Sequence, residues 1–199
     1  METLCREELA LQRKLRPYDC LELASALNNL GNLLRLQGKL ADAETNLLES
    51  VAMHRRITGN TERGLTLNNL AIVFTREGKL AEAEATYGEL LPVLRKDAEG
   101  GGAEALNDVA WFLATCPSSS VRDGTNAVAC AEKSVAATGR KNLSYLDTLA
   151  AAYAEAGQFA KAISIIKEAL ALPHSREDEA SLASRLKLYE SNSPYRDSD

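Results

Sequence analysis

Cysteine and histidine are the residues of this sequence that could bind a metal or act as a nucleophile, and they are scattered along the chain. The four cysteines are separated by 14, 95 and 13 residues, so none has the C-x-x-C spacing of a zinc site. They are Cys5, Cys20, Cys116 and Cys130. The two histidines, at positions 54 and 174, are expected at solvent-facing helix ends. The sequence therefore predicts reduced thiols, no metal site and no cofactor.

Cys116 is the cysteine with the best chance of reactivity, because it precedes Pro117 at an expected helix end, where it would be exposed. A nucleophilic thiol needs a base beside it, and neither histidine is close in sequence. The chain also contains no glycine-rich phosphate loop and no nucleophile with a base at a signature spacing. We predict that the protein is not an enzyme and has no catalytic residue.

Composition favours a helical protein that binds neither nucleic acid nor membrane. Alanine and leucine each occur 31 times, whereas glycine and proline total 17 of 199 residues. The net charge of −5 argues against binding to phosphate backbones. No apolar run approaches the roughly 18 residues of a membrane span, and the first residues lack the apolar core of a signal peptide. A cytoplasmic location is predicted.

Paired asparagines are the polar residues whose spacing most needs a reason. Asn28 and Asn29 are repeated 40 residues later as Asn68 and Asn69, inside stretches that are expected to be helical. Asparagine costs a helix roughly half a kcal/mol relative to alanine. Its amide both donates and accepts hydrogen bonds, so it can bind the backbone of a ligand or link neighbouring helices. Both interpretations stay open.

A buried helical stripe positions these side chains and recurs at steps of 40, 39 and 40 residues. Its members follow the i, i+3, i+4, i+7 spacing of one helix face, and the third member is always Gly or Ala. The four copies are Leu27, Leu30, Gly31, Leu34; Leu67, Leu70, Ala71, Phe74; Leu106, Val109, Ala110, Leu113; and Leu146, Leu149, Ala150, Tyr153. A second helix follows each stripe, and Gly38, Gly78 and Gly157 are expected to end the first helix in a left-handed cap.

Two segments, NNLGNLLRLQGKLADAETNLLESV and NNLAIVFTREGKLAEAEATYGELL, carry the small residue, the inter-helix glycine and the following alanine. In these features the chain resembles the tetratricopeptide repeat family from about Ser25 to Leu172. The spacing of 40 resembles the repeats of kinesin light chains and related bacterial arrays. The resemblance implies an all-α fold, a right-handed α-solenoid of stacked helix-turn-helix repeats.

The repeats divide the chain into a series of expected elements. We expect a single domain over residues 1–191 and a flexible polar tail over 192–199. The domain comprises a half-repeat helix at 4–16, repeats at 19–58, 61–97, 102–138 and 142–173, and a capping helix at 176–190. The third repeat departs from the others, since five extra residues separate its helices around Cys116 and Pro117.

The face of each first helix that points away from the stripe would line the concave side of such a stack. It is rich in amides and apolar at two positions, which suits an extended peptide or a partner helix. The candidate binding residues are Asn28, Asn29, Asn32, Arg35, Asn68, Asn69, Ile72, Arg76, Asn107, Trp111 and Asp147. The resemblance implies that the asparagines contact bound peptide, while the residues themselves also allow a role in stacking. Trp111 is equally compatible with packing between repeats.

These observations predict a non-catalytic interaction module that binds a protein or peptide partner in its concave groove. Asn28 and Asn68 stand where a clamp for acidic chaperone tails would need lysine, so that subtype is disfavoured. The alternative is an assembly module. Helix 4–16 lacks its partner helix, so either it caps the stack or its apolar side, including Leu9 and Leu11, associates with a second copy or another chain.

Overall fold

The computed structural model describes residues 1–15, 20–57 and 63–197. Within these ranges the regular structure is entirely helical and contains no strand, which confirms the predicted all-α fold of helical repeats. The chain divides into two compact units, Met1–Val93 and Leu94–Asp199, which are described separately. The expected starts of the first two repeats, at 19 and 61, and the tail residues 198–199 lie outside the described residues. The grouping of the repeats into one domain stays a prediction.

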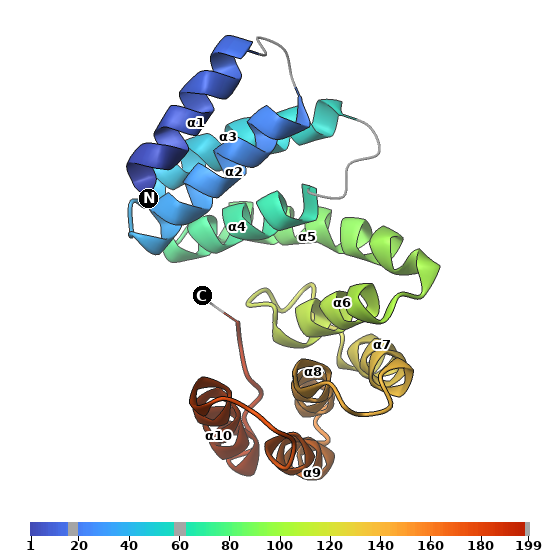
Figure 1. Ribbon diagram of the computed structural model, residues 1–199. Helices are drawn as coiled ribbons and strands as arrows, with labels where there is room; N and C mark the ends of the chain where they lie inside the picture. The colour runs from blue at the N-terminus through green and yellow to red at the C-terminus, as the bar shows by residue number, and fades with distance from the viewer. Residues whose placement is uncertain (16–19, 58–62, 198–199) are drawn as a thin grey trace. The chain divides into compact units, whose positions relative to one another are not determined.

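Five helices make up the described part of the first unit (Figure 1). They are α1 (Glu2–Leu15), α2 (Leu21–Leu36), α3 (Leu40–Arg56), α4 (Arg63–Arg76) and α5 (Leu80–Asp97), whose last residues extend beyond the unit. Helices α2 and α3 pack closely because Gly31 faces Leu47: a Cβ at position 31 would lie 2.6 Å from Leu47 Cγ. Buried Ser50 on α3 also donates a 2.7 Å hydrogen bond to the carbonyl of Ala24 on α2. The small residue of the stripe thus permits the approach that the sequence predicts.

The first helices of the first, second and fourth repeats end in the same turn. Gly38, Gly78 and Gly157 have φ values of 75°, 75° and 73°, in the left-handed region. The amide that follows each glycine donates to a carbonyl of the last helical turn, as in Lys39 N to Leu34 O at 2.9 Å. These bonds satisfy helix-end carbonyls, and the glycine avoids the steric cost of the left-handed conformation.

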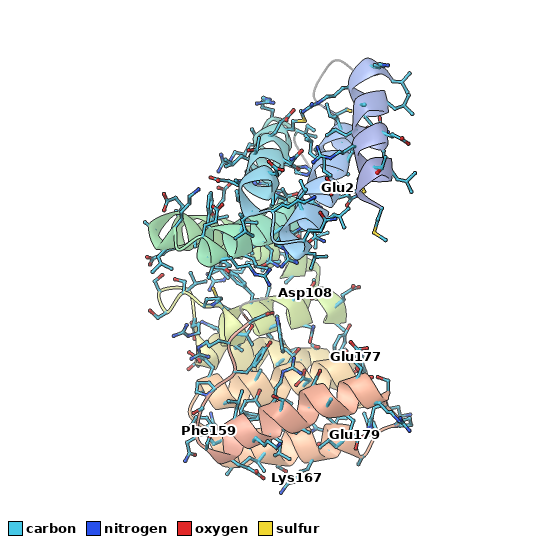
Figure 2. The ribbon with its side chains drawn as sticks, turned by 90° about the vertical axis from the view of Figure 1, so that its left-hand side faces the viewer. Glu2, Asp108, Phe159, Lys167, Glu177 and Glu179 are labelled. Carbon is cyan, nitrogen blue, oxygen red and sulfur yellow. The ribbon has the colours of Figure 1, made fainter. Side chains whose placement is uncertain are left out.

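Up to residue 197, the second unit contains a short 3-10 helix, Ala98–Gly100, and five α-helices. These are α6 (Ala103–Thr115), α7 (Gly124–Ala137), α8 (Leu143–Glu155), α9 (Phe159–Leu170) and α10 (Arg176–Glu190). Phe159 and Glu177, near the starts of α9 and α10, lie at opposite ends of this antiparallel pair (Figure 2). Helix α8 packs between α6 and α9, and α10 packs on α9 (Figure 1).

The five extra residues of the third repeat are accommodated by a turn between α6 and α7 that the Arg122 side chain organises. Its Nη1 donates hydrogen bonds of 2.9 Å to the carbonyls of both Cys116 and Pro117. Asp123 then caps α7 by accepting a 3.0 Å bond from the amide of Asn126. The insertion is therefore an ordered turn within the repeat.

Helix α10 ends in a turn that sends the chain back along the second unit. Asn192 has a φ of 56°, and the amide of Ser193 donates a 2.9 Å bond to the carbonyl of Leu188. Asparagine tolerates this left-handed conformation at a helix end, and Pro194 cannot continue the helix. Residues 195–197 contact helices of this unit, and the flexibility expected of the tail stays a prediction.

Candidate functional site

One face of the second unit, formed by α6, α8 and α10, carries polar and aromatic side chains that contact one another. Three residues define it: Trp111 on α6, Asp147 on α8 and Arg185 on α10. We call this surface the α6–α8–α10 face. Residues 193–197 return from α10 toward α6 and lie against it (Figure 1).

Asp197 is held on α6 through both its side chain and its backbone. The indole Nε1 of Trp111 donates a 2.7 Å hydrogen bond to Asp197 Oδ2. The backbone amide of Asp197 donates a 2.9 Å bond to the carbonyl of Thr115, one helical turn later. Because the acceptor is a carboxylate, the indole bond is of the stronger, charge-assisted kind.

Aromatic rings and a guanidinium form the centre of the site. The rings of Trp111 and Tyr195 lie with their centroids 5.8 Å apart, tilted by 43°. The Arg185 guanidinium carbon lies 4.7 Å from the Tyr195 centroid and 5.3 Å from the Trp111 centroid. Both distances fall within the range of a cation–π interaction. Trp111 is half-buried, so its ring is shared between packing and surface contact.

Arg185 is fixed in place by Asp147. Its Nη1 donates a 2.7 Å hydrogen bond to Asp147 Oδ2, and both side chains are largely buried. Burial raises the pKa of Asp147 to about 6, while the neighbouring guanidinium partly offsets this shift. The other carboxylate oxygen, Oδ1, is buried and has no hydrogen-bond partner among the residues that the structure describes. Asp147 is therefore a positioning residue for Arg185.

A second charged cluster lies beside this centre. Glu155, the last residue of α8, pairs with Arg196 at 2.7 Å and with Arg122 at 3.0 Å. All three side chains are at least partly buried. Three successive residues thus contact three different groups of the α6–α8–α10 face. Tyr195 contacts the aromatic centre, and Arg196 contacts the Glu155 carboxylate. Asp197 contacts the Trp111 indole N–H and the Thr115 carbonyl.

In the first unit, the predicted asparagines lie on α2 and α4, and two of them join these helices. Asn69 Nδ2 donates a 3.0 Å hydrogen bond to Asn28 Oδ1. Asn32 accepts bonds from Nε and Nη2 of Arg35 at 3.1 and 3.0 Å. Asn28, Asn32, Asn68 and Asn69 are half-buried. For the Asn28–Asn69 pair, this geometry supports the stacking interpretation.

The remaining predicted residues differ widely in exposure. Arg35 and Ile72 are buried, with exposed fractions of 8% and 7%, whereas Asn29 and Arg76 are exposed. Asn107 on α6 is half-buried, and its Oδ1 atom has no hydrogen-bond partner within the described parts of the chain. The structure brings Trp111 and Asp147 together through Arg185.

Two expectations about reactive side chains are wrong. Cys116 is buried, and burial raises the pKa of its thiol to about 11, so it stays protonated near neutral pH. His54 has only 1% of its surface exposed because it packs inside the first unit instead of facing solvent. Among the described residues, no group of three or more His, Cys, Asp or Glu side chains could hold a metal ion. None of the described helices is long and apolar enough to cross a bilayer.

Sequence reasoning missed Arg185, Glu155 and the three residues of the returning segment. Asn192 and Pro194, directly after a predicted helix, are a local signal for the turn. Nothing local indicates which surface the following residues meet, because Trp111 and Asp197 are 86 positions apart.

Stacked antiparallel helix pairs with a left-handed glycine between their helices define a helical-repeat protein. Residues 22–96 and 146–180 match models of the tetratricopeptide repeat, and together they cover more than half of the 199 residues. The chain belongs to the tetratricopeptide repeat family. Proteins of this family generally act as scaffolds for protein interactions and are generally not enzymes.

A solved structure shares this fold at low sequence identity. The crystal structure of BtubC (BKLC) from P. vanneervenii is 22% identical, covers 92% of this chain and 73% of that chain, and has a TM-score of 0.58. A tetratricopeptide repeat protein from Parabacteroides merdae ATCC 43184 is 18% identical, covers 94% of this chain and 79% of that chain, and has a TM-score of 0.41. No curated protein sequence matches the chain.

Proposed function

We propose that this protein is a non-catalytic scaffold that binds an extended segment of a partner protein on its concave surface, at the α6–α8–α10 face of the second unit. The observation that carries the proposal is the contact of residues 195–197 with this face. These residues have neither helix nor strand structure, yet each contacts the face through a specific group. A surface that holds one irregular segment of polypeptide has the groups needed to hold another.

The chemistry of the face suits peptide recognition. Trp111 offers a large ring and a hydrogen-bond donor, and Arg185 offers a cation that lies over two aromatic rings. The carbonyl of Thr115 accepts a backbone amide, a contact that any peptide residue except proline can make. Side chains give specificity to such a site, and main-chain bonds add affinity.

In the first unit, the candidate partner contacts are Asn29, Asn68 and Arg76. Asn28 and Asn69 bind each other, and Arg35 binds Asn32, so we assign these four residues to the stability of the helix stack. Ile72 is assigned to the core of the unit, since it is buried.

A comparison of captured proteins tests the proposal. The wild-type chain, the variant Asn107→Ala/Trp111→Phe and the control Lys133→Ala on α7 are each used to capture partners from lysate, with quantitative mass spectrometry. Trp111→Phe keeps an aromatic ring and removes the indole donor, and Lys133 is exposed. We expect partners that bind wild type and control but are lost from the variant. Equal capture by all three, with unchanged circular dichroism, would rule out this face.

The second candidate is assembly through α1, and the exposure of that helix favours it. Leu9 packs against the unit, whereas Leu4, Leu11 and Leu15 have exposed fractions of 68%, 54% and 66%. Exposed leucines on one helix are a feature of interaction surfaces. Sedimentation equilibrium should then show a mass that rises with concentration in wild type and stays monomeric in Leu11→Glu. A wild-type chain that is monomeric at high concentration would exclude self-association. The cytoplasmic location, and the absence of nucleic acid and membrane partners, stay predictions.

A further inference from the structure

The three residues Tyr195, Arg196 and Asp197 have three different chemistries, and the α6–α8–α10 face meets each of them with a complementary group. The three contacts are a cation–π contact, an ion pair and a hydrogen bond, so they are more specific than general packing. They involve groups on α6 and α8 as well as on α10.

The aromatic position is filled by Tyr195. Its ring packs against both the Arg185 guanidinium, 4.7 Å from the ring centroid, and the tilted indole of Trp111, 5.8 Å away between centroids. Arg185 is held there by the buried carboxylate of Asp147, so the position exists independently of Tyr195. Any flat aromatic ring can occupy this position, because the contacts with Arg185 and Trp111 depend only on the face and edge of the ring.

The basic position is filled by Arg196, whose guanidinium lies 2.7 Å from Glu155. Arg122 neutralises the other oxygen of Glu155 at 3.0 Å and orients the carboxylate. The acidic position is filled by Asp197, which accepts from the Trp111 indole and donates its amide to the Thr115 carbonyl. The backbone bond fixes the register of the triplet on α6.

The turn at Asn192 delivers this triplet to the face. Because the turn is closed by hydrogen bonds to the last turn of α10, only a few residues separate a fixed helix end from the binding positions. A tether this short gives the segment a high effective concentration, in the millimolar range for short flexible linkers. Another peptide must therefore compete with residues 193–197.

We infer that the α6–α8–α10 face binds extended peptides that carry an aromatic–basic–acidic triplet, and that residues 193–197 are an intramolecular competitor for such peptides. This inference rests on the proposed function, because it names the ligand chemistry of the same face. Molecules whose face is occupied by residues 193–197 cannot bind a partner. The apparent affinity for a partner therefore falls as the occupied fraction of molecules rises. Release of the segment is then the step that admits a partner.

The test uses a fluorescein-labelled peptide with the sequence of residues 191–197, SNSPYRD, and the full chain. Its binding is measured by anisotropy with wild type, with Tyr195→Ala/Asp197→Ala, and with the control Glu190→Gln. The control removes one negative charge from the exposed end of α10. We expect the double variant to bind at least about tenfold more tightly than wild type and control, because its own segment no longer competes.

Two further measurements keep the result decisive. Trp111 is the single tryptophan, so its emission reports directly on the face, and we expect a red shift in the double variant with unchanged circular dichroism. Adding Trp111→Phe to the double variant should weaken binding of the peptide, and a peptide with Ala in place of Tyr and Asp should not bind.

Equal affinity of the labelled peptide for wild type and double variant would overturn the competition. Absence of binding to a double variant whose Trp111 emission has shifted would overturn the assigned ligand chemistry. Neither outcome decides the proposed function, because the capture of partners from lysate with Asn107→Ala/Trp111→Phe tests that function separately. Loss of partner capture in that experiment, together with peptide binding here, would support both.

Discussion

Asn69 on α4 donates a hydrogen bond of 3.0 Å to Asn28 on α2, a residue 41 positions earlier. The two residues occupy neighbouring positions in successive repeats, and both are half-buried. An amide can complete such a bond because it contains both a donor and an acceptor. Asn28 and Asn69 thus connect one repeat to the next, at a modest cost in helix propensity.

Removing this bond should destabilise the first unit by roughly 0.5–1.5 kcal/mol of unfolding free energy. We expect Asn28→Ala and Asn69→Ala each to lower stability, and the double variant to lose less than the sum of the two. A double-mutant cycle in urea, followed by circular dichroism, measures the coupling. Asn29→Ala is the control, since Asn29 is exposed. Strictly additive effects would show that the bond contributes nothing.

The stability of the second unit should depend on pH through Asp147. Its pKa in the folded protein is about 6, above the ordinary 3.8, because burial disfavours the carboxylate more than Arg185 stabilises it. The folded state therefore binds this proton more tightly than the unfolded state. The contribution of Asp147 to stability is largest below about pH 4 and is lost as the pH rises through about 6.

The variant Asp147→Asn removes this titration. Relative to the variant, we expect the wild-type unfolding free energy to fall by on the order of 2 kcal/mol between about pH 4 and pH 7. Urea titrations at several pH values, followed by Trp111 fluorescence, report on the second unit. A difference between the two proteins that stays constant with pH would contradict the assignment.

Two glycines inside helices of the first unit should respond oppositely to the same substitution. Gly31→Ala places a Cβ 2.6 Å from Leu47 Cγ, so we expect a loss of about 1–3 kcal/mol from overpacking between α2 and α3. Gly88 on α5 has no heavy atom within 4 Å of the corresponding position. Gly88→Ala should therefore stabilise the helix by up to about 1 kcal/mol. Thermal melts of the two variants that shift in the same direction would refute the packing of α2 on α3.

Asn142 begins α8, the helix that carries Asp147 and Glu155. Its side chain accepts a 3.2 Å hydrogen bond from the amide of Tyr145. Asn142→Ala should cost roughly 1 kcal/mol, as is typical of a lost helix cap, and lower the melting temperature of the second unit. The control Ser164→Ala changes an exposed position of α9 and should have little effect. Equal melting temperatures for Asn142→Ala and wild type would mean that the cap is not stabilising.

Much of the fold could be predicted because its determinants are local. The spacing of Leu27, Leu30, Gly31 and Leu34 defines a buried face within one helix, and Gly38 marks where that helix ends. The expected capping helix at 176–190 has the same bounds as α10. Repetition at about 40 residues then indicates that like helices stack on like helices.

The candidate site was predicted only in part, because burial depends on packing. Ile72 and Trp111 occupy equivalent positions in their repeats, yet Ile72 is buried and Trp111 half-buried. The polar composition of residues 192–197 predicted a frayed tail, but aromatic and charged side chains find partners that no local pattern reveals. Cys116 and His54 were expected to be exposed because their burial, too, depends on tertiary packing and not on a local pattern.

By itself, the sequence determined that this protein is a stack of helical hairpins, because helix periodicity, small residues and left-handed turns act over a few residues each. It also determined that the chain turns after α10, through Asn192 and Pro194. Only the tertiary structure decided that Tyr195 meets Arg185 and Trp111, and that Asp197 meets α6. Those contacts join residues up to 86 positions apart, and their geometry follows from how the hairpins pack.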